Sequence, residues 1–138
     1  MERFRSNYGS ILFIVITDDI DYCAKVFSDF DDVVLSENSY EVDFAIMSFC
    51  KGGILSASTF SWWGAFYSKM FNQDNLLYVA PRYWIGHRSK KWHPEGIQTD
   101  WLTYQQNSLF KRFLIIISIE FFAIKTPFSD LISLKYYL

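Results

Sequence analysis

The chain has 138 residues, of which 51% are hydrophobic and 20% are aromatic, and its formal net charge is -2. This length and composition suit a single domain with an ordinary hydrophobic core and exclude an intrinsically disordered chain. The basic residues are few and scattered, so we expect no nucleic-acid partner.

The first part of the chain opens an alternation of strand and helix patterns. Residues 1–10 are too polar for a signal peptide or a membrane anchor, and we expect an N-terminal extension there. Ile11–Ile16 is a continuous apolar run, which is typical of a strand buried on both faces. The next predicted elements are a helix over Ile20–Phe27 and a short strand over Val33–Leu35.

A second helix is predicted over residues 41–50. Its spacing places Val42, Ala45, Ile46 and Phe49 on one apolar face, with Asp43 on another. The sequence Lys51-Gly52-Gly53 favours a stop at the end of this helix.

The alternation continues with a strand over 54–56, a helix over 61–71 and a strand over 76–79 that Pro81 closes. Short connections between alternating strands and helices predict a parallel sheet covered by helices and built from right-handed crossovers. The predicted fold is therefore α/β and Rossmann-like, with the main domain over residues 11–104.

Residues 82–104 read as an ordered loop region that is rich in polar and aromatic side chains. It contains His87 and His93, but the nearby acids do not complete a zinc ligand set, and we expect no metal. Residues 105–138 have no clear period. They are either a terminal strand or helix that completes the sheet or the product of an incorrect gene model.

Two further features bear on the compartment. The apolar run over 113–124 is too short to cross a bilayer, so no membrane segment is expected. Cys23 and Cys50 have no metal-site spacing and fall in predicted amphipathic helices, which favours free core thiols over a disulfide.

Acidic side chains fall at or near the carboxyl ends of the first two predicted strands, where doubly wound sheets bind ligands. Asp18 and Asp19 could act as a base, bind a metal or ribose hydroxyls, or cap the next helix together with Thr17. Asp43 could bind the N–H groups of a guanine ring or could be a solvated acid on a helix face.

The stretch Ser58-Thr59-Phe60-Ser61 follows the third predicted strand and runs into a helix. Hydroxyls and backbone N–H groups at a helix N-terminus favour an anion such as a phosphate. Thr59 or Ser61 could equally be a simple N-cap. The adjacent pair Trp62-Trp63 is either a core plug or the wall of a binding site.

Four motifs, in this order, resemble the C-terminal half of the family 11 glycosyltransferases, the α-1,2-fucosyltransferases, over roughly residues 11–84. They are Thr17-Asp18-Asp19-Ile20-Asp21-Tyr22-Cys23, Val42-Asp43-Phe44-Ala45-Ile46-Met47-Ser48-Phe49-Cys50-Lys51, Ser58-Thr59-Phe60-Ser61-Trp62-Trp63-Gly64-Ala65 and Ala80-Pro81-Arg82-Tyr83-Trp84.

The resemblance implies a GT-B-type enzyme whose C-terminal Rossmann-like domain binds GDP-fucose. Such an enzyme transfers fucose, with inversion, to the 2-hydroxyl of a galactose in a glycan, and no metal or other cofactor is expected. The resemblance also implies the Golgi membrane as the location, although this sequence does not itself show an anchor.

The same resemblance assigns roles to the polar residues. Asp43 would hold the guanine, Asp18 and Asp19 would lie near the nucleotide, and the stretch after the third strand would line the diphosphate. The last group consists of Ser58, Thr59, Phe60 and Ser61.

One element of the family pattern is missing. The family's His-x-Arg-Arg-type motif, which supplies arginine to the diphosphate, belongs to the N-terminal half, and nothing before Ile11 resembles it. Without those bidentate contacts we expect a fragment that carries the donor-binding half and does not transfer fucose alone. Two other hypotheses are a non-catalytic remnant that folds or binds nucleotide sugar without transfer, and a purely structural α/β interaction domain.

Overall fold

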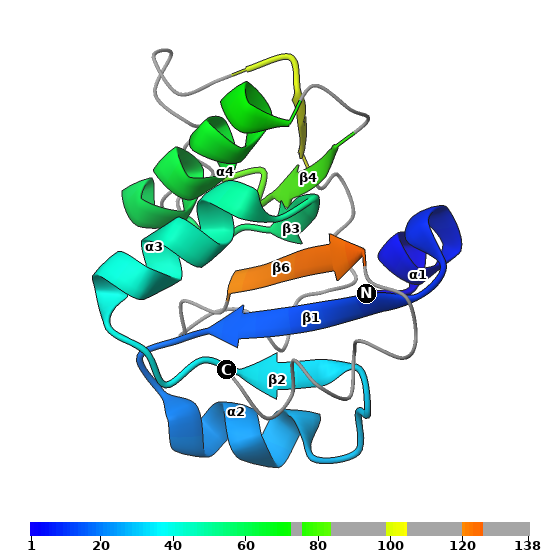
Figure 1. Ribbon diagram of the computed structural model, residues 1–138, viewed down its shortest axis with the longest axis vertical. Helices are drawn as coiled ribbons and strands as arrows, with labels where there is room; N and C mark the ends of the chain where they lie inside the picture. Colours follow the sequence, from blue (N-terminus) through cyan, green and yellow to red (C-terminus); the bar gives the residue numbers. More distant parts are fainter. Residues whose placement is uncertain (73–75, 84–98, 105–119, 126–138) are drawn as a thin grey trace.

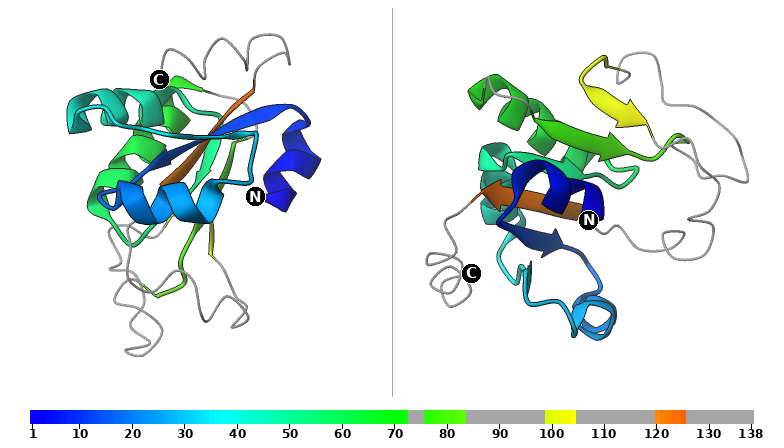
Figure 2. Two further views of the ribbon diagram at one scale, coloured as in Figure 1. Left: turned by 90° about the horizontal axis from the view of Figure 1, so that it is seen from below. Right: turned by 90° about the vertical axis from the view of Figure 1, so that its right-hand side faces the viewer.

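The computed structural model describes residues 1–72, 76–83, 99–104 and 120–125. Its strands form one sheet in the order β2-β1-β6-β3-β4-β5. Helices cover both faces of this sheet (Figure 1, Figure 2). The elements follow the chain as α1 (Glu2–Tyr8), β1 (Ile11–Ile16), α2 (Ile20–Phe27), β2 (Val33–Leu35), α3 (Tyr40–Phe49), β3 (Gly52–Ile54), α4 (Thr59–Phe71), β4 (Leu77–Ala80), β5 (Leu102–Tyr104) and β6 (Glu120–Lys125).

The predicted α/β architecture is confirmed, with one difference at the centre of the sheet. β1 pairs in parallel with β2, β3 with β4, and β4 with β5. β6 lies between β1 and β3 and runs antiparallel to both, so its arrow in Figure 1 points against that of β1. Residues 120–125 thus form a strand that completes the sheet, one of the alternatives expected for residues 105–138, but this strand lies at the centre of the sheet and runs antiparallel to its neighbours.

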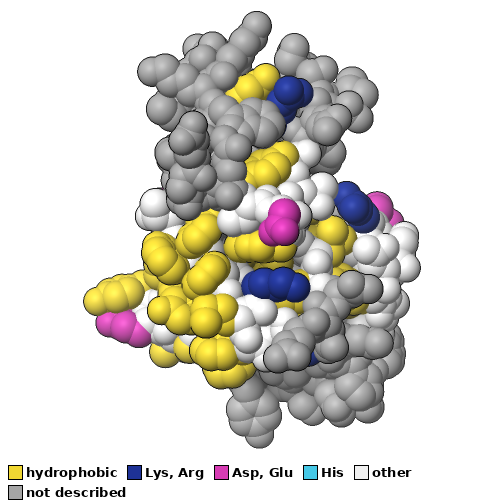
Figure 3. Space-filling model, turned by 90° about the horizontal axis from the view of Figure 1, so that it is seen from above, with side chains coloured by type: hydrophobic (Ala, Val, Ile, Leu, Met, Phe, Trp, Pro, Cys, Tyr) yellow, Lys and Arg dark blue, Asp and Glu magenta, His cyan; other side chains and the backbone are white. Residues whose placement is uncertain are grey.

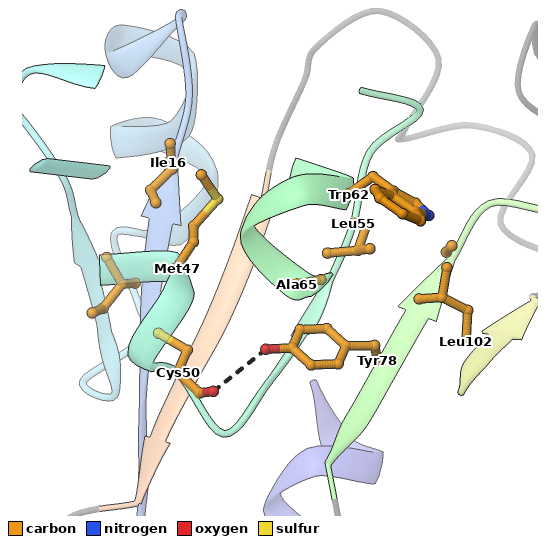
Figure 4. Packing of buried hydrophobic residues seen from close by; sticks show 10 residues of the cluster. Ile16, Met47, Cys50, Leu55, Trp62, Ala65, Tyr78 and Leu102 are labelled. Carbon is orange, nitrogen blue, oxygen red and sulfur yellow. Dashed lines mark hydrogen bonds between the residues drawn. The ribbon is translucent and has the colours of Figure 1, made fainter. Parts of the chain in front are cut away.

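The side chains of β1 alternate between two hydrophobic cores. Ile11, Phe13 and Val15 pack on the face that α1 and α2 cover. Ile14 and Ile16 pack on the other face, in the cluster with α3 and α4 that Figure 4 shows. Because both faces of the strand are covered, all six of its residues are buried, as the apolar run predicts.

The predicted N-terminal extension contains α1, which packs on the sheet. Phe4 is buried against Phe13, with ring centroids 6.2 Å apart. Arg5 donates two hydrogen bonds to the Asp32 carboxylate, from Nε at 2.7 Å and from Nη2 at 2.8 Å. Gly9 ends the helix with a φ of 72°, a conformation that glycine adopts without strain, and the chain turns into β1.

The strand β3 begins two residues earlier than predicted. Gly52 and Gly53, which were expected to stop the preceding helix, are the first residues of β3, and α3 has already ended at Phe49. A Cβ at Gly52 would lie 2.5 Å from the carbonyl oxygen of Leu77 in β4. The glycine is therefore required by close packing within the sheet rather than by a helix stop.

The buried face of α3 also differs from the predicted one. Val42 and Phe49, expected on the apolar face, are 46% and 70% exposed, whereas Asp43 and Met47 are buried. The reason is the approach of α4: a Cβ on Gly64 would come within 2.7 Å of the Cβ of Met47. α3 thus packs on α4 through the face that contains Asp43 and Met47, and the apolar stripe with Val42 and Phe49 is exposed to solvent.

This stripe continues onto α4 as an exposed apolar surface. Figure 3 shows hydrophobic side chains gathered on the side of the molecule where α3 and α4 lie. The exposed large hydrophobic residues of the two helices are Tyr40, Val42, Phe49, Trp63, Tyr67, Met70 and Phe71.

Both cysteines are buried and free, in agreement with the free-thiol alternative. Burial raises the pKa of the Cys50 thiol, whose Sγ donates to the carbonyl of Ile46 at 3.2 Å. The carbonyl of Cys50 accepts a hydrogen bond from the Tyr78 hydroxyl at 3.4 Å (Figure 4). It also accepts one from Ser68 Oγ at 2.6 Å. These bonds hold the end of α3 against α4 and β4.

Several predictions concern residues outside the described part of the chain. These are the loop segment 84–98 with His87 and His93, and the segments 105–119 and 126–138. Among the described residues, no helix is long and apolar enough to span a bilayer. Nor does that part of the chain bring together three His, Cys, Asp or Glu residues that could hold a metal ion.

Candidate functional site

The carboxyl ends of the parallel strands bring the predicted site residues to one edge of the sheet. β1 ends just before Asp18 and Asp19, β2 ends before Ser36, and β3 ends before the loop that leads to Ser58. The strands β1 to β4 all run in the same direction, so these ends share an edge, which we call the carboxyl edge. This is where doubly wound sheets bind ligands.

The acidic pair after β1 has two different environments. Asp19 is the N-cap of α2, since its carboxylate accepts a hydrogen bond from the backbone N–H of Tyr22 at 3.1 Å. The Thr17 hydroxyl in turn accepts from the Asp19 N–H at 3.1 Å. Asp18 and Asp19 are both exposed at the carboxyl edge, and the Asp19 carboxylate in addition caps α2.

Asp43 is not the solvated acid that its sequence context favoured. It is 8% exposed and accepts a hydrogen bond at Oδ1 from Ser36 Oγ at 2.5 Å. Asn38 donates to the same Ser36 hydroxyl oxygen at 2.9 Å. The pairing explains how the carboxylate is tolerated in the first turn of α3, because the hydroxyl replaces a water that burial removes.

Burial raises the pKa of Asp43, and the hydrogen bond from Ser36 opposes this shift without cancelling it. Sequence reasoning missed Ser36. Its signal was present, because a serine directly after a predicted strand lies at the carboxyl edge, and the next helix brings Asp43 back to the same edge.

The N-terminus of α4 lies at the end of the loop after β3. Ser58 is its N-cap and accepts a hydrogen bond from the Phe60 N–H at 3.2 Å, so the predicted caps Thr59 and Ser61 are wrong. The helix begins at Thr59, two residues before its predicted start. Ser58 is the N-cap because its backbone is extended, as a cap residue requires, whereas Thr59 and Ser61 are already helical.

The four residues of this stretch differ in exposure. Thr59 is exposed, while Ser58 and Phe60 are half-buried. Phe60 packs on Phe44 of α3 with ring centroids 5.5 Å apart. Ser61 is fully buried, and its hydroxyl donates to the carbonyl of Ser58 at 3.1 Å. A ligand at this edge can therefore meet the side chains of Ser58 and Thr59, whereas Ser61 can reach it only through its backbone N–H.

The tandem tryptophans divide between core and surface. Trp62 is buried and stacks on Phe66 at 5.4 Å, with the Trp101 ring 6.2 Å away. Trp63 lies edge-on to Trp62 at 5.0 Å and is 47% exposed. Trp62 thus anchors the first turn of α4, which agrees with the core-plug alternative for this residue, whereas Trp63 is partly exposed.

Arg82 is a residue of the carboxyl edge that sequence reasoning named only as part of a motif. It follows β4 by two residues, and its guanidinium lies 5.5 Å from the centre of the Tyr83 ring. Because Ile54 of β3 pairs with Val79 of β4 and the Leu55 N–H bonds the Val79 carbonyl, the two strands leave the sheet side by side. Arg82 therefore emerges beside the loop that precedes Ser58.

Arg82 is also the single basic residue at this edge among those that the structure describes. The others lie in α1, in the last turns of α2 and α4, or at the opposite ends of β3 and β6, namely Arg3, Arg5, Lys25, Lys51, Lys69 and Lys125. Among the described residues, Arg82 is therefore the positive partner available to an anion at the carboxyl edge.

An open hollow lies at the other edge of the sheet, where α1 meets the start of β4. None of the predicted site residues lines it; its walls are Ser6, Asn7, Tyr8, Leu76 and Leu77. We place the candidate site at the carboxyl edge instead, because the N-terminus of α4 and the Ser36–Asp43 pair lie there and none of the described residues that line the hollow is charged.

Comparison with known proteins finds a matching family and related enzymes. The model of the family "Glycosyl transferase family 11" matches residues 1–105. An alpha-1,2-colitosyltransferase from Escherichia coli is 39% identical over 86 residues, which cover 59% of this chain and 29% of the relative. The O-antigen biosynthesis glycosyltransferase WbnK from Escherichia coli is 30% identical over 86 residues, which cover 59% and 28%.

The match thus spans less than a third of the length of these two relatives. No solved structure matches the chain.

Proposed function

The chain belongs to glycosyl transferase family 11, and we propose that its carboxyl edge binds the nucleotide-sugar donor of an α-1,2-fucosyltransferase. In this proposal GDP-fucose is the donor, and the complete enzyme transfers fucose, with inversion, to the 2-hydroxyl of a galactose-terminated glycan. The observation that carries the proposal is the convergence of a buried carboxylate and a capped helix N-terminus on one edge of a parallel sheet.

The diphosphate is assigned to the N-terminus of α4. The first N–H groups of a helix have no acceptor within the helix, and the helix dipole favours negative charge there. Thr59 adds an exposed hydroxyl, and Arg82 emerges from the neighbouring strand. As GDP departs, charge develops on its phosphates, and prearranged N–H and guanidinium donors stabilise that charge.

The guanine is assigned to Asp43. A guanine ring presents two adjacent N–H donors, which match the two oxygens of a carboxylate. Ser36 engages Oδ1 and fixes the orientation of the group, while Oδ2 can accept a further bond. An adenine or uracil base has no such pair of donors at the corresponding edge, so the carboxylate supplies base specificity.

The sugar is the less constrained part of the donor. The name of the colitosyltransferase contains the same α-1,2 linkage but a different transferred sugar. A colitosyl donor is therefore the second candidate, and both donors would use the same nucleotide contacts.

Isothermal titration of the full chain with GDP, ADP and UDP tests the nucleotide assignment. We expect GDP to bind best, and Asp43→Asn to weaken GDP by about ten- to a hundredfold, the range for a hydrogen bond to a charged group. Glu41→Gln, on the exposed side of the same helix, is the matched control and leaves the affinity unchanged. Equal affinity for the three nucleotides, or an unchanged Asp43→Asn variant, contradicts the proposal.

Transfer is tested separately from binding. Incubation of the chain with GDP-fucose carrying labelled fucose and a galactoside shows whether the donor half acts alone. We expect GDP binding without labelled product. Labelled product would show that the 138 residues are a competent transferase by themselves.

A further inference from the structure

The position between β1 and β3, which we call the slot, is occupied by a strand that runs antiparallel to both neighbours. Two blocks of parallel strands, β2-β1 and β3-β4-β5, are joined only through β6 in the described part of the chain. A doubly wound sheet of order 3-2-1-4-5-6 has its first strand at this place, parallel to its neighbours. β6 fills the place in the opposite direction, pairing with all six residues of β1 but with only Gly53 and Ile54 of β3.

The position of α1 suits a slot strand that runs parallel to β1 and is connected to β1 through α1. Phe4 packs on Phe13 of β1 and also lies against Gly52 of β3. The Tyr8 hydroxyl accepts from the Leu77 N–H at 2.8 Å and donates to the Lys51 carbonyl at 3.1 Å. α1 therefore bridges β1 and the β3-β4 block across the slot that β6 fills.

α1 also lies on the same face as α2. The step from β1 to β2 passes through α2 and moves outward along the sheet. A step from the slot through α1 to β1 would move in the same direction on the same face. It would thus have the same hand as the crossover already present, which satisfies the strong preference for one hand in parallel units.

The direction of β6 also differs from that of the strands around it at the carboxyl edge. Because β6 is antiparallel, its first residue, Glu120, pairs with Ile16 at the carboxyl edge. β6 therefore brings its amino end to the edge where β1 to β4 all end. A parallel strand in this place would bring its carboxyl end there, as its neighbours do.

We propose that the slot between β1 and β3 is an acceptor site for a parallel apolar strand joined to the N-terminal side of α1, and that β6 is its replaceable occupant. The strand must be apolar on both faces, because α1 and α2 cover one side of the sheet and α3 and α4 the other. The exchange of strands does not depend on the donor assignment. Only its effect on the carboxyl edge rests on the proposed function.

The experiment extends the full chain before Met1. The extension is a strand of about six Val and Ile residues, a short turn, and roughly one helical turn that lengthens α1. A matched control carries proline at alternate positions of the added strand, which prevents it from pairing on both sides. Hydrogen exchange by mass spectrometry then compares the amides of β1, β3 and β6 in the parent chain and the two extended chains.

We expect protected β6 amides in the parent and in the proline control. In the apolar extension the exchange of β6 amides should accelerate by about tenfold or more, while β1 and β3 stay protected because the new strand pairs with them. Protection of β6 that persists in the apolar extension overturns the proposal. Loss of protection in β1 overturns it as well, since the slot would then reject the strand.

This readout needs no nucleotide. Titration of the same variants with GDP separates the two proposals: strand exchange without GDP binding would contradict the proposed function and leave the acceptor site standing.

Discussion

Ser36 donates a hydrogen bond to the carboxylate of Asp43 across the carboxyl ends of β1 and β2, and both side chains are buried. The Ser36 N–H also bonds the carbonyl of Val15, which fixes the serine to the end of β1. The carboxylate is thus held by the sheet itself rather than by its own helix. A binding group that is oriented before the ligand arrives loses little entropy on binding.

The first prediction concerns the dependence of stability on pH. The pKa of Asp43 is raised above its ordinary value of 3.8, with burial as the largest cause. The folded chain therefore binds more protons than the unfolded chain between pH 3.8 and the raised pKa. We expect the contribution of Asp43 to the free energy of unfolding to fall as pH rises through this window, as urea denaturation at several pH values would measure.

Two variants isolate this contribution. Asp43→Asn should remove the fall, and Ser36→Ala should enlarge it, because the hydrogen bond from Ser36 lowers the pKa. A parent-like pH profile in Asp43→Asn would show that another group is responsible. Together with the loss of GDP affinity expected above, a stable Asp43→Asn variant would mark Asp43 as a residue kept for binding at a cost in stability.

The second prediction separates Thr59 from Ser61. Thr59→Ala removes an exposed hydroxyl at the start of α4 and should lower GDP affinity by about two- to tenfold with little effect on stability. Ser61→Ala removes the buried bond to the Ser58 carbonyl and should cost about 0.5–1.5 kcal/mol of stability with nearly unchanged affinity. Calorimetry and urea denaturation on both variants measure the two effects, and the reverse pattern would place the ligand on the Ser61 hydroxyl.

The third prediction concerns the contact between α3 and α4. Helix propensity alone predicts that Gly64→Ala stabilises the chain by roughly 0.5–1 kcal/mol. The new Cβ, however, would lie 2.7 Å from the Cβ of Met47, an atom that can move only with its helix. We expect the clash to dominate, with a net loss of about 1–3 kcal/mol in urea denaturation. A gain in stability would mean that α3 and α4 separate easily.

Those parts of the fold could be predicted in which the local sequence pattern alone determines the structure. The apolar run Ile11–Ile16 and the acid-capped helix Ile20–Phe27 have the bounds that were expected. In contrast, Val42 and Phe49 satisfy helical spacing but face outward, because the choice of buried face depends on the approach of Gly64. Spacing along one helix contains no information about its partner.

The candidate site was predictable to a similar extent. Asp18, Asp43 and Ser58 could be placed at one edge, because parallel strands align their carboxyl ends. The Ser36–Asp43 bond and the burial of Ser61 depend on side-chain orientation, which no spacing rule gives. The antiparallel direction of β6 and its place beside β1 could not be predicted either, because they depend on pairing between residues far apart in the sequence.

The last prediction concerns Arg82 as the cation of the carboxyl edge. Arg82→Ala should weaken GDP binding by about ten- to a hundredfold, and Arg82→Lys should recover only part of the loss, because lysine cannot form the planar bidentate contact with a phosphate. Raising the salt concentration should reduce the affinity of the parent more than that of Arg82→Ala, since the lost interaction is ionic. Lys69→Ala, which removes a cation from the last turn of α4 at the other edge, is the matched control and should bind like the parent. Equal weakening in Arg82→Ala and Lys69→Ala would indicate a general effect of net charge, and the phosphates would then have to lie elsewhere.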